Sequence, residues 1–121
     1  MKTNKTTLAK VKRQVIKAYT EANRNLHFKA SAPVTIDEAV KIMTEALDVG
    51  HEAMEGYNNF SPQLFRSLPE GTKITLAREG SVCAYIKPPK DIPLQVAKLS
   101  RAMVVDEFDK AANGTWRIWW D

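Results

Sequence analysis

The stretch His51-Glu-Ala-Met-Glu55 is the part of this sequence that comes nearest to a metal-binding motif. Zinc proteases use His-Glu-x-x-His on a helix, because two imidazoles one turn apart converge on one metal ion. Here Glu55 stands where the second histidine would be, and the chain's only other histidine and only cysteine are His27 and Cys83. A zinc site needs three or four ligands of these kinds. The sequence therefore predicts no metal site, and it predicts that His51 lies on a helix surface.

Cys83 could act as a nucleophile only beside a general base, and no local pattern supplies one. A cysteine in a strand is usually a small, buried, apolar residue. The five glycines are scattered and do not have the spacing of a phosphate-binding loop. We therefore expect no catalytic residue and no cofactor. Of the three classes of function that we consider for this chain, an enzyme of unidentifiable type ranks last, after a protein-binding module and a nucleic-acid-binding protein.

Positive charge is concentrated at the start of the chain. Residues 1–30 hold eight basic side chains and one acidic one, whereas the net charge of the whole chain is only +4. At about 100° per residue, a helix over residues 6–26 would gather Lys10, Arg13, Lys17 and Arg24 on the face opposite its apolar side. Such a face can contact phosphates or an acidic protein surface. The alternatives are an ordinary solvated face, or pairing with the acidic residues of the next helix.

All three tryptophans fall within the last six residues of the sequence. In a strand, alternation would send Trp116 and Trp120 to one face and Arg117 and Trp119 to the other. We expect the first pair in the core. A small sheet backed by helices leaves one face to solvent, so Arg117 and Trp119 are expected there. Tryptophan and arginine are enriched at binding hot spots, which makes this pair a candidate contact with a partner.

These side chains need a scaffold, and its first half is predicted to consist of two amphipathic helices. Apolar residues recur at steps of three and four over residues 6–26 and 35–57. The second helix begins with a capping box, in which Thr35 is the N-cap and Glu38 follows three residues later. The segment "HFKASAP" between the helices is predicted to be a linker, held extended by its proline.

The second half is predicted to form most of a small antiparallel sheet. A short helical turn in "FSPQLF" precedes a hairpin over residues 72–87, and the last strand covers residues 115–120. Between them, residues 93–112 are predicted to be a helix that Asn113-Gly114 would stop. The alternative is that part of this stretch, "AMVVDEF", is a strand. The predicted fold class is α+β with about three strands.

The length of 121 residues predicts a single domain over residues 1–121. The start of the sequence carries positive charges without an apolar run behind them, and no stretch approaches the length of a membrane span. With one cysteine and hence no intrachain disulfide, these features favour a cytoplasmic protein.

We expect a small non-enzymatic module that binds another protein with an acidic surface, as an inhibitor, adaptor or regulator. Short chains without family motifs are often accessory proteins of phages or mobile elements, and we expect that setting. The alternative is a nucleic-acid-binding protein that uses the basic face of residues 6–26. A helix-turn-helix, an RNP motif and a zinc finger are all missing from the sequence, as are aromatic residues among the basic ones.

Overall fold

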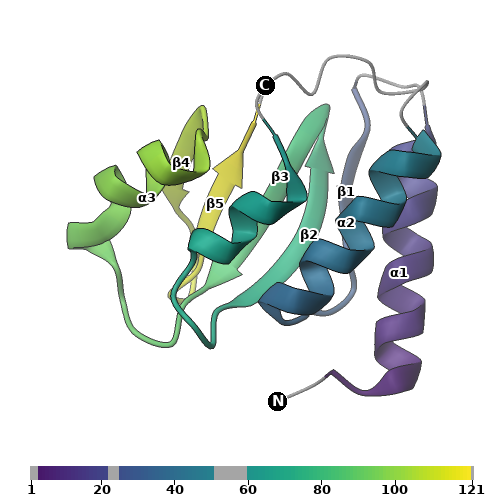
Figure 1. The fold of residues 1–121 in the computed structure, drawn as a ribbon, viewed down its shortest axis with the longest axis horizontal. Coiled ribbons are helices and arrows are strands. Elements are labelled where there is room, and N and C mark those ends of the chain that lie inside the picture. The colour runs from purple at the N-terminus through teal and green to yellow at the C-terminus, as the bar shows by residue number, and fades with distance from the viewer. Residues whose placement is uncertain (1–2, 22–24, 51–59, 121) are drawn as a thin grey trace.

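The protein is a five-stranded antiparallel sheet with helices packed on one of its faces (Figure 1). The computed structural model describes residues 3–21, 25–50 and 60–120. In chain order the elements are α1 (Lys5–Thr20), β1 (His27–Lys29), α2 (Ile36–Gly50), the 3-10 helix η1 (Pro62–Ser67), β2 (Lys73–Glu79), β3 (Ser81–Lys87), the 3-10 turn η2 (Pro93–Gln95), α3 (Val96–Met103), β4 (Glu107–Lys110) and β5 (Trp116–Trp119). The strand order is β1-β2-β3-β5-β4. None of the described helices is long and apolar enough to cross a membrane.

Helix α1 begins at a true N-cap and ends earlier than its apolar pattern predicted. The side chain of Asn4 accepts hydrogen bonds from the backbone N–H groups of Thr6 (2.9 Å) and Thr7 (3.4 Å). Glu21 already has extended backbone angles, so the predicted helix over residues 6–26 is too long at its C-terminal end. The apolar spacing at Leu26 fits the helical period only by coincidence, because α1 ends at Thr20 and a strand starts at His27.

Helix α2 confirms the predicted capping box. The backbone N–H of Thr35 donates to Glu38 Oε1 (2.9 Å), and the backbone N–H of Glu38 donates to Thr35 Oγ1 (3.2 Å). Two of the free N–H groups at the start of the helix are thereby satisfied. The last residues of the predicted helix 35–57, which include His51 and Glu55, lie outside the described residues.

The predicted hairpin 72–87 is confirmed, and the sheet extends beyond it. Strands β2 and β3 pair from Lys73↔Lys87 to Glu79↔Ser81, around Gly80, whose φ of 71° suits glycine. Strand β1 forms in the predicted linker and pairs with β2, so that prediction was wrong. A three-residue strand is too short for its alternation to be read from the sequence, and its pairing with β2 defines it.

The helix predicted over residues 93–112 is correct only in its first half. Helix α3 ends at Met103, and β4 then pairs with β5, so the part-strand alternative is the correct one for Glu107 and Phe108. Asn113 (φ 59°) and Gly114 (φ 73°) make the tight turn between β4 and β5. Two consecutive positive φ angles favour a hairpin turn, and Asn-Gly is its preferred sequence. The predicted count of about three strands therefore becomes five.

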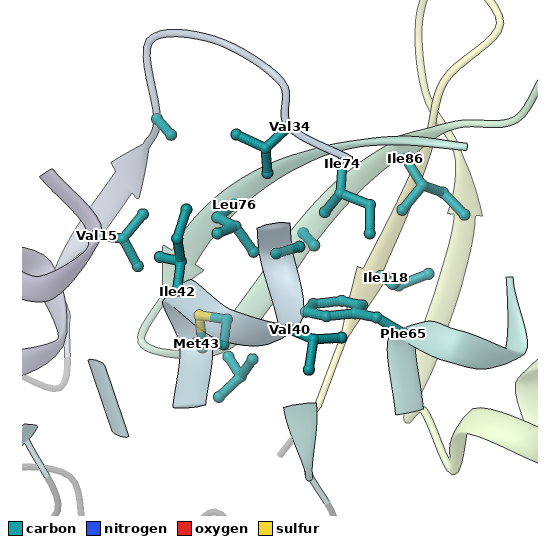
Figure 2. Close-up of a cluster of buried hydrophobic side chains, with 14 of the residues drawn as sticks. Val15, Val34, Val40, Ile42, Met43, Phe65, Ile74, Leu76, Ile86 and Ile118 are labelled. Atoms are coloured by element: carbon teal, nitrogen blue, oxygen red, sulfur yellow. The ribbon is translucent and has the colours of Figure 1, made fainter. Parts of the chain in front are cut away.

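The core lies between the helices and the inward face of β2, β3 and β5 (Figure 2). Ile74, Ile86 and Ile118 point from the sheet toward Met43 of α2 and Phe65 of η1, and all five are essentially inaccessible to solvent. The packing is therefore one helical layer on one sheet face. The second face of the sheet is free of helices in the described part of the chain (Figure 1).

Candidate binding surfaces

The predicted division of the tryptophans between two faces is present in the structure. Trp120 is fully buried, and its ring packs edge-on against Phe60 (4.7 Å between centroids) and Phe65 (5.9 Å). Its Nε1 donates to the carbonyl oxygen of Met103 (2.8 Å). Trp116 is 7 % exposed and packs against Phe108. These two tryptophans fill the core and are not available to a partner.

Trp119 faces the helix-free side of the sheet but is not freely exposed. It is partly buried, with Cys83 opposite it on β3 and Glu107 opposite it on β4. Its Nε1 donates to the backbone carbonyl of Glu79 on β2 (2.9 Å), so the indole lies across β3. The ring therefore helps to fasten β5 to the hairpin.

Arg117 shares this face, and its guanidinium is occupied by three carboxylates. It contacts Glu79 through Nη2 (2.8 Å) and Nε (3.0 Å), Glu107 through Nη1 (2.7 Å), and Asp109 through Nη1 (3.5 Å). Only 21 % of the Arg117 side chain is exposed. Its positive charge is thus compensated within the chain, which the sequence could not indicate because β4 was not predicted.

Glu79 is the centre of this polar network. The Tyr85 hydroxyl donates to Glu79 Oε2, and the Cys83 thiol lies 3.5 Å from the same oxygen. Hydrogen bonds from Arg117 lower the pKa of Glu79 to about 2, against the opposing effect of burial. Burial, with Glu79 close by, raises the pKa of Tyr85 to about 12 and that of Cys83 to about 12. Cys83 is therefore a buried, protonated thiol, which agrees with its predicted packing role.

The exposed basic face of α1 is the second candidate surface. Lys10, Arg13 and Lys17 are exposed, and within the described ranges none of them forms an ion pair with a carboxylate. The fourth residue of the predicted stripe, Arg24, lies outside the described residues. One lysine of α1 does bridge the two helices: Lys12 Nζ lies 2.8 Å from Glu45 Oε2.

Two carboxylates at the start of α2, Asp37 and Glu38, are engaged away from the basic stripe of α1. Asp37 binds Lys41 (3.0 Å) and Arg66 (3.1 Å), and these hydrogen bonds lower its pKa. Glu38 is partly desolvated, yet its pKa is lowered because Thr3 and Thr35 donate to it. Asp37 and Glu38 therefore do not neutralise Lys10, Arg13 or Lys17.

A groove of about 590 Å³ runs between α1 and α2. Leu8 and Ile42 contribute its apolar lining, and four of the charged residues along it form two ion pairs, Lys12 with Glu45 and Lys41 with Asp37. This pairing suits a packed helix-helix seam better than a ligand pocket.

Sequence reasoning missed Arg78, which is fully buried on the helix-facing side of β2. Its Nη1 donates to the carbonyl oxygens of Ala18 and Glu21 at the end of α1, each at 2.6 Å, and its Nε donates to Gly80 (3.0 Å). The signal was available: alternation along the strand places residue 78 on the same inward face as Ile74. A buried arginine there must find carbonyl partners, and the end of a helix offers free ones.

Among the described residues, no group of three or more histidine, cysteine, aspartate or glutamate side chains is arranged to hold a metal ion. Comparisons with family models, curated proteins and solved structures found no match to this chain. The case for function therefore depends on the surfaces themselves.

Proposed function

We propose that this protein is a non-enzymatic binding module that docks on an acidic surface of another protein through the basic face of α1. The observation that supports this proposal is the set of exposed cations at Lys10, Arg13 and Lys17, for which the described chain supplies no carboxylate. Such a module would serve as an inhibitor, adaptor or regulator of its partner, in keeping with an accessory protein of a phage or mobile element.

The spacing of these residues suits a compact acidic patch. Steps of three and four residues keep Lys10, Arg13 and Lys17 on one side of the helix, over a length of about 10 Å. Helix α1 contains no acidic residue, so its field is uniformly positive and would steer an acidic partner during approach.

A protein partner is favoured over a nucleic acid at this surface. Among the described residues, the exposed side of α1 carries no aromatic side chain on which bases could stack, since Tyr19 is fully buried. Arg117 and Trp119, the other predicted contacts, contribute less because their polar atoms are already bonded within the chain. Any contact they make would be through the helix-free face of the sheet, where both are partly buried.

Charge reversal on α1 tests the proposal, with a matched reversal at Lys90 and at two residues of α3 as its control. The test variant carries Lys10→Glu, Arg13→Glu and Lys17→Glu. The control carries Lys90→Glu, Lys98→Glu and Arg101→Glu, which are also exposed and change the net charge from +4 by the same amount. We expect affinity capture from the native host lysate, after nuclease treatment, to retain one partner protein with the wild type and the control. The α1 variant should bind this partner at least about tenfold more weakly, a loss of about 1.4 kcal/mol in binding free energy.

Equal capture by the α1 variant and the control would contradict this proposal. Nuclease-sensitive material that the wild type and the control retain and the α1 variant loses would instead support the nucleic-acid alternative for α1. Circular dichroism of both variants serves as the folding check, because all six substituted side chains are exposed and should leave the fold intact.

A further inference from the structure

The helix-free face of β1, β2 and β3 brings together aromatic and basic side chains that are distant in sequence. Lys29 of β1 places its ammonium 4.4 Å from the centre of the Tyr85 ring on β3. Lys73 of β2 lies directly opposite Lys87 of β3, and Tyr85, two residues before Lys87, shares its face of that strand. Interleaved aromatic and basic residues are missing from α1, and here they are present.

The cross-strand pair of lysines is a feature that folding alone does not explain. Like charges directly opposite each other destabilise a sheet. Lys73, Lys87 and Lys29 are all exposed, and the described residues form no ion pair with any of them. The acidic residues of this face, Glu79, Glu107 and Asp109, are bound to Arg117 instead. The β1–β3 half of the face therefore keeps unpaired positive charge.

Tyr85 is held in a position suited to stacking. Tyr85 is partly buried, and Glu79 fixes its hydroxyl, so the ring is inclined along β3 toward the β2–β3 turn and its tilt is restrained. The Lys29 ammonium occupies the ring face as a cation–π partner. Because Lys29 is exposed, it can leave the ring without breaking a packed contact, and an aromatic base can take its place.

We propose that this half of the open face binds single-stranded nucleic acid. A base stacks on Tyr85, and the adjoining phosphates contact Lys29, Lys73 and Lys87. Three neighbouring strands span about 10 Å, which accommodates a short tract of an extended strand. Stacking on a ring is tolerant of sequence, because every base has a π-face, and backbone contacts from lysines are equally unspecific. The site is separate from the α1 surface and does not depend on it.

Fluorescence anisotropy with a labelled oligo-dT of about 12 nucleotides, at low salt, tests this site. The wild type should bind. Tyr85→Leu should weaken binding about tenfold, because it removes the stacking platform, whereas Tyr85→Phe should bind nearly as the wild type does. Lys73→Gln with Lys87→Gln should make the log–log salt slope shallower by about 1.4, at about 0.7 per phosphate on single strands. Lys90→Gln with Lys98→Gln is the matched control and should change neither quantity.

Three results would overturn this inference. The first is no binding of oligo-dT by the wild type at low salt. The second is binding that Tyr85→Leu leaves unchanged while the α1 charge reversal abolishes it, which would assign nucleic acid to α1. The third is equal affinity for a duplex of the same length, because paired bases cannot stack on Tyr85. Capture of a protein partner through α1 is measured after nuclease treatment, so the two proposals can fail independently.

Discussion

Glu79 determines the chemistry of the open sheet face at the scale of single residues. Its carboxylate accepts hydrogen bonds from Arg117 and Tyr85 and lies next to the Cys83 thiol. This one side chain therefore links β2, β3 and β5. In the sequence, Glu79 is a glutamate beside a turn glycine. Nothing in that pattern indicates that its carboxylate accepts hydrogen bonds from side chains of two other strands. Its role becomes apparent only once the register is known.

Replacing Glu79 by glutamine should reduce stability at neutral pH and remove part of the acid sensitivity. The pKa of Glu79 falls from its ordinary value near 4.5 to about 2 in the folded protein. A lowered pKa means that the carboxylate stabilises the fold fully above about pH 4.5, and that this contribution disappears as the pH falls toward 2. At about pH 7 we expect the variant to be about 2 kcal/mol less stable in urea denaturation, the scale of hydrogen bonds to a charged group.

Glu107→Gln provides the control, since Glu107 binds the same arginine but is 49 % exposed. The loss of stability in Glu107→Gln should be smaller than that in Glu79→Gln, and added salt should reduce it further. If the stability difference between wild type and Glu79→Gln stays constant from neutral pH down to about pH 2, then the charge of Glu79 does not stabilise the fold.

Alternation along a strand was the most reliable guide to single residues. It correctly separated Trp116 and Trp120 from Trp119, because the pleat is a property of the strand alone. It could not indicate that Arg117 is bound by three carboxylates, since two of these come from β4, which the sequence concealed within a predicted helix. Local periodicity predicts which way a side chain points, whereas its partners depend on tertiary pairing.

At the scale of elements, the stretch over residues 93–112 shows where propensity fails. Its apolar residues cover both faces, so helix and strand fit the sequence about equally well. The Asn-Gly turn decides between them, because it allows the preceding residues to pair with β5. The same dipeptide also stops helices, which is why its meaning was ambiguous before the sheet was known. The capping box of α2, by contrast, has one meaning and was predicted correctly.

The C-terminal end of α3 can be improved by a single substitution. Val104 has φ 54° and ψ 39°, the left-handed conformation that glycine usually adopts after a helix, and its N–H bonds to the Arg101 carbonyl. A β-branched residue is strained there. Val104 is 48 % exposed, so little burial would be lost. We expect Val104→Gly to stabilise the protein by about 0.5–1 kcal/mol in urea denaturation, after the entropy cost of glycine in the unfolded chain.

Gly114→Ala makes the opposite change, because it replaces a glycine by a residue with a side chain at a positive φ of 73°. The Cβ atom that it adds would have no neighbour within 4 Å. It should destabilise by about 1 kcal/mol through backbone strain alone. If Val104→Gly instead lowers stability by a similar amount, then the Val104 side chain stabilises the fold more than its exposure suggests.

At the scale of the whole molecule, Arg78 joins the two layers. It extends from the last residues of β2 to the end of α1 and donates to the carbonyls of Ala18 and Glu21. The negative end of the helix dipole and the ring of Tyr19, whose centre is 5.9 Å from the guanidinium carbon, compensate the buried charge. The basic face of α1 is therefore presented on a helix whose C-terminal end is fixed to the sheet. The position of the proposed binding surface depends on this internal contact.

Arg78→Met should release the end of α1 while leaving the sheet core intact. Methionine keeps much of the apolar bulk but leaves buried carbonyls without donors, at a cost of about 3 kcal/mol in global stability. Amide hydrogen exchange should show the last turn of α1 opening at lower free energy relative to β3, because the helix loses its anchor to the sheet. Arg66→Met is the control: Arg66 is exposed and binds Asp37 at the surface, so its loss should cost under about 0.5 kcal/mol. If exchange in Arg78→Met accelerates equally in α1 and β3, then Arg78 contributes only to overall stability and does not fix the helix in place.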